Sequence, residues 1–164
     1  MSILFEPIGV IHTPFYKPVG MPIQPAGAGD TLGTVELLPV YRPGLQDLDG
    51  FSHIILLYYL HRSQGFDLQV TPFLDSQPHG LFATRAPRRP NSIGLSVVRL
   101  RRVHDGVLYV TGVDMLDESP LLDIKPYVPD FDVPVATAVT VGWLEGRVQH
   151  AAGRKADARF QDKD

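Results

Sequence analysis

Glycine and proline are the residues that most constrain how this chain folds. The sequence contains 15 of each among its 164 residues. Both residues interrupt helices, because proline lacks an amide hydrogen and glycine loses the most backbone entropy on ordering. The sequence therefore disfavours a helical bundle. A chain of 164 residues is nevertheless long enough for one domain with its own hydrophobic core.

Short apolar segments separated by turns predict a mainly β fold. The apolar run from His53 to His61 has the length of a buried strand, and Asp105-Gly106 is typical of a hairpin turn between 93–100 and 107–113. Closure of these strands into a barrel would remove their exposed edges. The prediction is a single-domain β-barrel-like fold with few short helices, over residues 1–149, followed by a frayed tail over 150–164. Further strands are expected at 3–13, 34–38, 66–71, 79–84 and 137–144, a helical turn at 42–48, and a loop or short edge pieces over 114–134.

Several classes of protein are excluded or disfavoured by composition. The chain has no cysteine, which excludes disulfides, thiolate metal sites and a cysteine nucleophile. Its longest apolar run, 54–60, is too short to cross a membrane, and its first residues do not resemble a leader, so we expect a cytoplasmic protein. The net charge of -3 means that any contact with nucleic acid must come from a local basic patch.

The glycine cluster over 27–33 resembles a cofactor loop at first sight. Its spacing is one residue too long for the G-x-G-x-x-G pattern of dinucleotide-binding folds. The preceding segment 21–25 contains two prolines and is unsuited to a central strand. The cluster is therefore interpreted as a flexible turn, and a Rossmann fold is not expected.

A basic segment over 76–104 contains arginines but no acidic residue. Guanidinium groups bind carboxylates and phosphates in bidentate geometry. Two prolines stiffen the stretch that carries Arg85, Arg88 and Arg89, which favours a binding site there. The other arginines of the segment, Arg99, Arg101 and Arg102, lie in or beside the expected hairpin, where solvation or protection of a strand edge explains them.

An acidic segment over 112–127 follows one of the expected strands and is the second candidate site. Its carboxylates could hold ribose hydroxyls or a cationic ligand, or Asp117 and Asp123 could simply cap turns. A metal is not expected, because the segment has neither cysteine nor histidine and its spacing differs from a calcium loop. His61 and Arg62, at the exit of the apolar strand, are a further candidate, although a lone histidine there is more often structural.

These segments together resemble the TsaA-like (YaeB-like) domain family over residues 3–135. Members of known activity are S-adenosylmethionine-dependent tRNA methyltransferases that methylate the exocyclic nitrogen of threonylcarbamoyl-adenosine beside the anticodon. The resemblance implies a β-barrel, a homodimer and that activity. The motifs that carry it are Phe51-Ser52-His53, Gly80-Leu81-Phe82-Ala83-Thr84-Arg85, Arg89-Pro90-Asn91-Ser92-Ile93-Gly94-Leu95-Ser96, Asp114-Met115-Leu116-Asp117, Pro120 and Asp123-Ile124-Lys125-Pro126-Tyr127.

The resemblance also implies particular site residues. Arginine suits the carboxylate of S-adenosylmethionine, and the acidic loop suits its ribose, ammonium group or adenine edge. Contacts to the modified nucleotide or to tRNA phosphates are expected from Arg88, Arg89, Asn91 and Lys125. No catalytic base is identified, and Asp114, Asp117 and Asp123 are the candidates. The implied cofactor-binding residues are Gln24, Pro25, Ala26, His61, Arg62, Arg85, Leu95, Asp114, Met115, Leu116 and Asp117.

Two alternatives to a tRNA methyltransferase remain at this point. The domain could methylate a smaller acceptor, in which case we expect a closed pocket with the arginines turned away. It could instead bind S-adenosylmethionine without catalysis. A purely structural scaffold would leave Arg85 far from the acidic loop.

Overall fold

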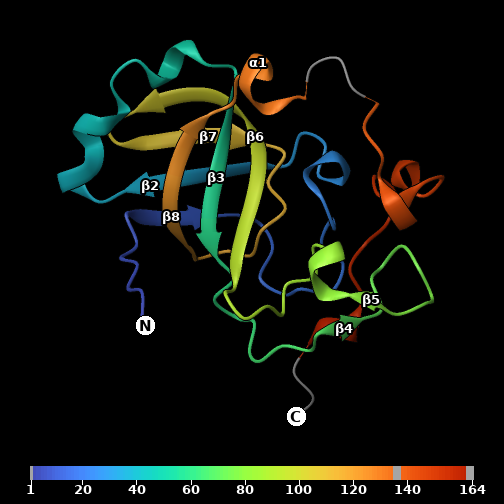
Figure 1. The fold of residues 1–164 in the computed structure, drawn as a ribbon. Helices are drawn as coiled ribbons and strands as arrows, with labels where there is room; N and C mark the ends of the chain where they lie inside the picture. Colours follow the sequence, from blue (N-terminus) through green and yellow to red (C-terminus); the bar gives the residue numbers. More distant parts are fainter. Residues whose placement is uncertain (1, 135–137, 162–164) are drawn as a thin grey trace.

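A closed, six-stranded antiparallel barrel is the main feature of the computed structural model, which describes residues 2–134 and 138–161 (Figure 1). The strand order around the barrel is β1–β2–β7–β6–β3–β8, and β8 returns to pair with β1. The predicted mainly β, barrel-like fold is therefore confirmed. The barrel strands are β1 (Gly9–His12), β2 (Leu32–Leu37), β3 (His53–Tyr59), β6 (Ile93–His104), β7 (Val107–Thr111) and β8 (Ser119–Pro126).

The remaining elements are short and lie outside the barrel. The connection between β3 and β6 carries a small sheet of two strands, β4 (Gln69–Val70) and β5 (His79–Gly80), beside the barrel (Figure 1). The α-helix α1 (Pro129–Asp132) follows β8. The 3-10 helices are η1 (Pro25–Gly27), η2 (Pro39–Leu45), η3 (Leu48–Gly50), η4 (Leu81–Ala83), η5 (Gly142–Leu144), η6 (Val148–His150) and η7 (Ala158–Phe160).

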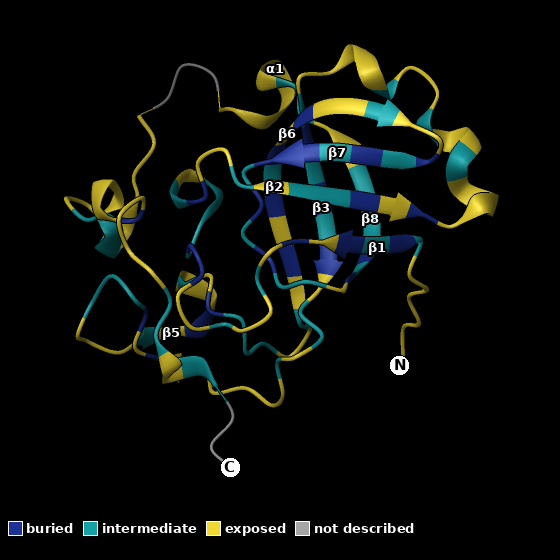
Figure 2. Ribbon diagram, turned by 180° about the vertical axis from the view of Figure 1, so that it is seen from behind, coloured by how far each residue is buried: buried dark blue, intermediate teal, exposed yellow. Residues whose placement is uncertain are grey.

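Side chains that alternate along the strands form the core inside the barrel. On β3, Ile54, Leu56 and Tyr58 are buried, and on β6 Val98 and Leu100 are buried. The alternation is visible along the strands in Figure 2. Because successive strand residues point to opposite faces, the residues between these positions lie on the outer surface. Burial of each large aliphatic side chain stabilises the fold by about 1.5–3 kcal/mol.

The hairpin between β6 and β7 forms as predicted at Asp105-Gly106. Both residues have positive φ, at 49° and 79°. Two residues with positive φ are what a type I′ hairpin turn requires, which explains the aspartate–glycine pair. The same turn is held against β2, because the amide of Leu37 donates to the carbonyl oxygen of Gly106 at 3.0 Å.

The acidic segment contains a full barrel strand, which its sequence pattern did not predict. We expected a loop or short edge pieces over 114–134, but β8 occupies 119–126 and closes the barrel between β1 and β3. Pro120 lies near the start of the strand, and a register shift between Leu57 and Tyr58 accommodates the irregular pairing. Proline is tolerated at strand starts and bulges, so its presence did not exclude a strand.

Four other predicted strands differ from the structure. Of the strand expected at 66–71, only Gln69–Val70 pairs. Of the strand expected at 79–84, only His79–Gly80 pairs, and residues 81–83 form η4. Of the strand expected at 3–13, only Gly9–His12 pairs. Of the strand expected at 137–144, residue 137 lies outside the described residues, and residues 142–144 form η5.

Described residues of the C-terminal segment pack against the loops beside the barrel. The amide of Ala156 donates to the carbonyl oxygen of Met21, and its own carbonyl oxygen accepts from the amide of Gly20, both at 2.8 Å. The indole Nε1 of Trp143 donates to the carbonyl oxygen of Ala83 at 2.8 Å. Over 150–161 the chain is therefore packed rather than frayed as expected, because it completes backbone hydrogen bonds of the loop 18–28.

Gly94 on β6 is packed against the ring of Tyr58 on the neighbouring β3. A Cβ atom at this position would overlap ring atoms of Tyr58, which is 5% exposed. We expect Gly94→Ala to lower the free energy of unfolding by about 1–3 kcal/mol, measured by urea denaturation, because the ring has no room to move. Gly80→Ala is the matched control, since nothing lies within 4 Å of its added Cβ. Equal effects of the two substitutions would contradict this packing argument.

Candidate functional site

A chain of hydrogen bonds links three polar side chains at the end of the barrel where β3 leaves and β6 begins. The hydroxyl of Ser96 donates to Oδ1 of Asp114 at 2.5 Å, and the hydroxyl of Tyr58 lies 3.1 Å from the Ser96 oxygen. Because the single proton of Ser96 goes to Asp114, Tyr58 must be the donor to Ser96. Burial raises the pKa of Tyr58, which keeps its phenol protonated for this role. The three residues therefore hold the Asp114 carboxylate in a fixed orientation.

The Asp114 carboxyl group is a buried acid with a perturbed pKa. Removal from water raises its pKa from 3.8 to about 6, against the opposing effects of the Ser96 hydrogen bond and the positive charge of Arg85. At neutral pH the group is still largely ionised, because neutral pH is above this value. The site thus holds a desolvated negative charge that a cation could neutralise.

Arg85 is exposed and provides a positive charge near this carboxylate. Its Nη1 donates to Oε1 of Gln24 at 2.8 Å, which joins the loop before η1 to the turn after η4. Arg85 is near enough for its charge to lower the pKa of both Asp114 and Tyr58. The structure therefore brings together three of the expected cofactor-binding residues from three distant parts of the chain. Pro25 and Ala26 follow Gln24 directly in η1.

His61 lies just beyond β3 and is the second unusual titratable group of this region. Both ring nitrogens are buried and have no hydrogen-bond partner among the described residues. Burial and the charge of neighbouring Arg62 lower the pKa of His61, so its ring is neutral at neutral pH. Buried polar atoms are normally paired, and these nitrogens therefore fit contact with a polar ligand.

Asp117 and Met115 mainly fix the acidic loop in place. The backbone amide of Thr13 donates to Oδ1 of Asp117 at 3.0 Å, and the hydroxyl of Thr13 donates to the carbonyl oxygen of Met115 at 2.9 Å. Met115 is 2% exposed and packs in the barrel core. Leu116 uses its carbonyl oxygen to accept from the hydroxyl of Ser119 at 2.7 Å. In this chain Asp114 is the acidic residue of the loop with a buried carboxylate.

Some predicted site residues lie apart from this group. Leu95 is 52% exposed and follows the alternation of β6, so it lies on the opposite strand face from Ser96. On β8, Nζ of Lys125 is 2.8 Å from Oδ2 of Asp123, with both side chains exposed and Lys125 opposite Ile55 in the ladder. Asp123 is therefore not part of the buried network that contains Asp114.

The predicted nucleic-acid-binding residues have different surroundings. Arg89 donates through Nη1 to the carbonyl oxygens of Thr84 and Ala86, at 3.0 and 3.2 Å, so it holds the turn that carries Arg85. Asn91 is exposed. Arg88 lines a separate cleft, and its Nε is buried without a partner among the described residues.

Tyr58 and Ser96 were not identified as site residues from the sequence. Ser96 interrupts an otherwise apolar set of inward positions on β6, and a polar residue at such a position needs a buried partner. That signal was available once the strand had been recognised. Tyr58 gave no comparable signal, because an aromatic residue is common in a buried strand.

Within residues 2–134 and 138–161, no group of three or more histidine, aspartate or glutamate residues is arranged to hold a metal ion. The same described residues include no helix that is both long and apolar enough to span a membrane.

The fold and the site define a class of protein: a single antiparallel barrel with a mixed-charge polar site at one end. Comparison with known proteins identifies the family within this class. Residues 10–133 match the family model described as the tRNA-methyltransferase O N-terminal domain. The chain belongs to this family, which confirms the resemblance to TsaA-like proteins seen in its sequence.

Three similar proteins illustrate the relationship. A relative from Pyrococcus abyssi, named as a probable S-adenosyl-L-methionine-binding protein, is 49% identical over 98% of this chain and 86% of its own length. The tRNA (adenine(37)-N6)-methyltransferase of Mus musculus is 35% identical over 81% of this chain and 32% of its own. The crystal structure of TrmO from Pseudomonas aeruginosa has a TM-score of 0.70 and 39% identity, covering 84% of this chain and 62% of that one. This chain therefore spans most of the first relative but only part of the other two.

Proposed function

We propose that this chain is an S-adenosylmethionine-dependent methyltransferase that acts on the exocyclic nitrogen of threonylcarbamoyl-adenosine next to the anticodon of tRNA. The names of its relatives support methylation of a tRNA adenine and binding of this cofactor. The observation that carries the proposal for this chain is the buried carboxylate of Asp114 near the guanidinium group of Arg85. A structural scaffold would have no use for a buried carboxylate beside an exposed guanidinium group.

The residues present fit the amino-acid part of S-adenosylmethionine, which carries both a carboxylate and an ammonium group. Arg85 would bind the carboxylate, with Gln24 holding the guanidinium in position. Asp114 would bind the ammonium, since a buried carboxylate gains most from a cationic partner. The unpartnered ring nitrogens of His61 would hydrogen-bond a polar group of the same ligand.

Bound there, S-adenosylmethionine would supply an activated methyl group, which would pass from its sulfur to the acceptor nitrogen while that nitrogen loses a proton. The contribution of the protein is to position the two reactants in line and to exclude water. The buried Tyr58–Ser96–Asp114 chain keeps one end of the site rigid, which limits misalignment.

We further propose that the protein acts as a homodimer in the cytoplasm. On the outer surface of β3 and β6, Tyr59, Ile93 and Leu95 are 44%, 40% and 52% exposed, and an apolar strand face of this kind favours association. Analytical ultracentrifugation tests the proposal: a dimer that Leu95→Glu converts to a monomer supports it, and a monomeric unsubstituted protein overturns it.

Methyl transfer to tRNA is expected only when the tRNA contains threonylcarbamoyl-adenosine. The purified protein is incubated with labelled S-adenosylmethionine and with tRNA from cells that can or cannot make this nucleoside. Label in the first tRNA pool alone supports the proposal. Label in both pools would show a broader adenine methyltransferase and would contradict the specific acceptor.

The same assay separates the two alternatives. Cofactor binding by calorimetry without transfer to either tRNA pool would overturn the tRNA methyltransferase proposal. Transfer to a small acceptor would then indicate a small-molecule enzyme, and binding without any turnover would indicate a non-enzymatic binding domain.

A further inference from the structure

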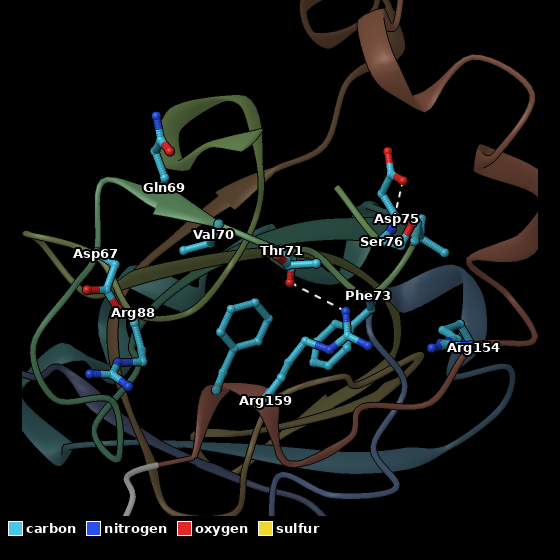
Figure 3. Close-up of a pocket in the computed structure, with 12 residues that line it drawn as sticks. Asp67, Gln69, Val70, Thr71, Phe73, Asp75, Ser76, Arg88, Arg154 and Arg159 are labelled. Atoms are coloured by element: carbon cyan, nitrogen blue, oxygen red, sulfur yellow. Dashed lines mark hydrogen bonds between the residues drawn. The ribbon is translucent and has the colours of Figure 1, made fainter. Parts of the chain in front are cut away.

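A cleft of about 840 Å³ lies beside the barrel, between residues 67–76 and the C-terminal segment (Figure 3). Arg88 lines it from the turn after η4, and Arg154 and Arg159 line it from the C-terminal segment. The rings of Phe73 and Phe160 also line it. The residues from the C-terminal segment lie beyond the part of the chain that the family model matches, which is 10–133.

Two carboxylates line the cleft, and they differ in whether they are already paired with other side chains. Asp75 is engaged, because its Oδ2 lies 2.9 Å from Nε2 of His79 and 3.6 Å from Nη2 of Arg147. The hydrogen bond from His79 lowers the pKa of Asp75, so its carboxylate remains ionised and engaged with His79 and Arg147. Asp67 is the other carboxylate on the lining, and it forms no ion pair within the described residues.

Two of the three arginines keep donors for a ligand. Arg159 is engaged, because Nη2 pairs with Asp157 at 2.7 Å and Nη1 donates to the carbonyl oxygen of Pro72 at 2.6 Å. Nε of Arg88 is buried and has no hydrogen-bond partner among the described residues. Arg154 is exposed and forms no ion pair within the same residues. An anion in the cleft would pair with the guanidinium groups of Arg88 and Arg154, which both line the cleft.

Aromatic rings accompany these cations. Phe73 and Phe160 meet edge to face with 5.1 Å between ring centroids, and the guanidinium carbon of Arg159 lies 5.1 Å from the centroid of Phe73. Both rings are partly accessible. Arginines interleaved with partly accessible aromatic rings are typical of sites that bind the phosphates and bases of single-stranded nucleic acid.

The cleft is also connected to the cofactor site. The turn 84–89 carries Arg85, which bonds Gln24, and three residues later Arg88, which lines the cleft. Arg89 holds this turn through its backbone carbonyl groups, so the two arginines are positioned together. A ligand that reaches from one site to the other must extend along this turn, as a nucleic-acid strand can and a mononucleotide cannot.

We propose that this cleft binds a phosphate and a base of the RNA strand next to the nucleoside that is methylated. The inference rests on the proposed tRNA substrate and adds a binding subsite to it. Arg88 and Arg154 hold the phosphate, and the rings of Phe73 and Phe160 contact the base. An acidic protein segment fits less well, because it offers no base for the aromatic rings.

Binding of an anticodon stem-loop RNA tests the charge contribution. Removal of one phosphate contact by Arg88→Gln or Arg154→Gln is expected to weaken binding about tenfold. Each substitution should also lower the slope of log K against log salt by about 0.7–0.9. Arg99→Gln, on the opposite end of the β3–β6 ladder at His53, is the matched control and should change neither quantity. Arg154 is exposed, so its variant is not expected to impair folding.

Photo-crosslinking tests where on the protein the RNA binds. The chain contains no cysteine, so Gln69→Cys places a single crosslinker on the rim of the cleft and Asp49→Cys places one in η3. We expect the RNA to crosslink at position 69 and not at position 49. A free mononucleotide that blocks crosslinking as efficiently as the stem-loop would instead identify a nucleotide pocket, and blocking by polyglutamate alone would identify a site for acidic protein. Either result would overturn the RNA subsite.

The failure of this inference can be distinguished from the failure of the proposed function. If the protein methylates tRNA, but both arginine variants bind RNA with unchanged affinity and salt slope, the cleft is not the subsite. If the protein methylates no tRNA, yet the variants lose RNA binding and position 69 crosslinks, the cleft is an RNA-binding site and the proposed reaction is wrong. Calorimetry with S-adenosylmethionine provides an independent readout, since neither arginine substitution should alter it.

Discussion

Arg85→Ala is expected to weaken S-adenosylmethionine binding by about 10- to 100-fold, because hydrogen bonds between charged groups contribute about 1.5–3 kcal/mol each. Arg85 is the arginine that bonds Gln24 and influences the pKa of Asp114. Loss of its side chain removes both the cation for the ligand carboxylate and the opposite charge near Asp114. Isothermal titration calorimetry measures the loss directly. Methyl transfer should fall with it at low cofactor concentration.

Three further variants show which property of Arg85 is responsible for the loss of cofactor affinity. Arg85→Lys keeps the charge without the bidentate geometry, so it should recover only part of the affinity. Gln24→Ala should have a smaller effect than Arg85→Ala, because Gln24 positions the guanidinium without supplying charge. Arg99→Ala changes an exposed arginine of β6 at the other end of the ladder and should bind normally. Unchanged affinity in Arg85→Ala would exclude this arginine from the cofactor site.

The pattern of strands and turns was predictable where the local signal was strong. The continuous apolar run of β3 favours a buried strand. The Asp105-Gly106 pair favours a tight hairpin turn, because both residues tolerate positive φ. The failed glycine pattern over 27–33 correctly argued against a Rossmann fold, since the cluster joins η1 to the start of β2. The strand β8 was missed because prolines and acidic residues lower strand propensity, whereas pairing on both sides stabilises it.

The site could be predicted only in pieces. The basic turn and the acidic loop could each be identified from the sequence. That they lie close together at one end of the barrel depends on the tertiary fold, which no local sequence pattern predicts. For the same reason it missed Ser96, whose role depends on the position of Asp114 in space. Lys125 and Leu95 adjoin recognisable motifs in the sequence, yet strand alternation places Leu95 on the outer face, and Lys125 pairs there with Asp123.

The C-terminal segment shows where composition misleads. An Ala-rich, charged end suggested fraying, but Ala156 completes backbone hydrogen bonds of the loop that carries Gln24. Trp143 similarly bonds Ala83, two residues before Arg85. The segment therefore braces the two parts of the chain that carry Gln24 and Arg85, which are two of the proposed cofactor-binding residues. Such contacts depend on distant partners, so the segment alone could not reveal them.

Asp114 is expected to make cofactor binding pH-dependent in the range around its pKa of about 6. Below that value the carboxyl group is protonated and no longer attracts an ammonium group, so affinity should fall by up to about tenfold for each further pH unit. Asp114→Asn keeps an acceptor for the Ser96 hydroxyl but has no charge, so its binding should be weaker at neutral pH and nearly independent of pH. Calorimetry from about pH 5 to about pH 8 distinguishes the two proteins.

The stability of the free protein should respond to the same proton in the opposite direction. A pKa raised from 3.8 to about 6 means that burial favours the protonated form. The resulting stabilisation is complete below pH 3.8 and is lost as the pH rises through about 6, a change of about 3 kcal/mol. Asp114→Asn should therefore unfold at a higher urea concentration than the unsubstituted protein near pH 8, even though it binds the cofactor more weakly.

Opposite effects on binding and stability are what separate a functional carboxylate from a structural one. Asp123→Asn is the matched control, because Asp123 is an exposed partner of Lys125 on β8 and should change neither pH profile. If Asp114→Asn destabilised the protein and left cofactor binding intact, the carboxylate would be a structural partner of Ser96 and Tyr58. If it stabilises the protein and weakens binding, the burial of Asp114 is maintained at the expense of stability because the ligand requires its charge.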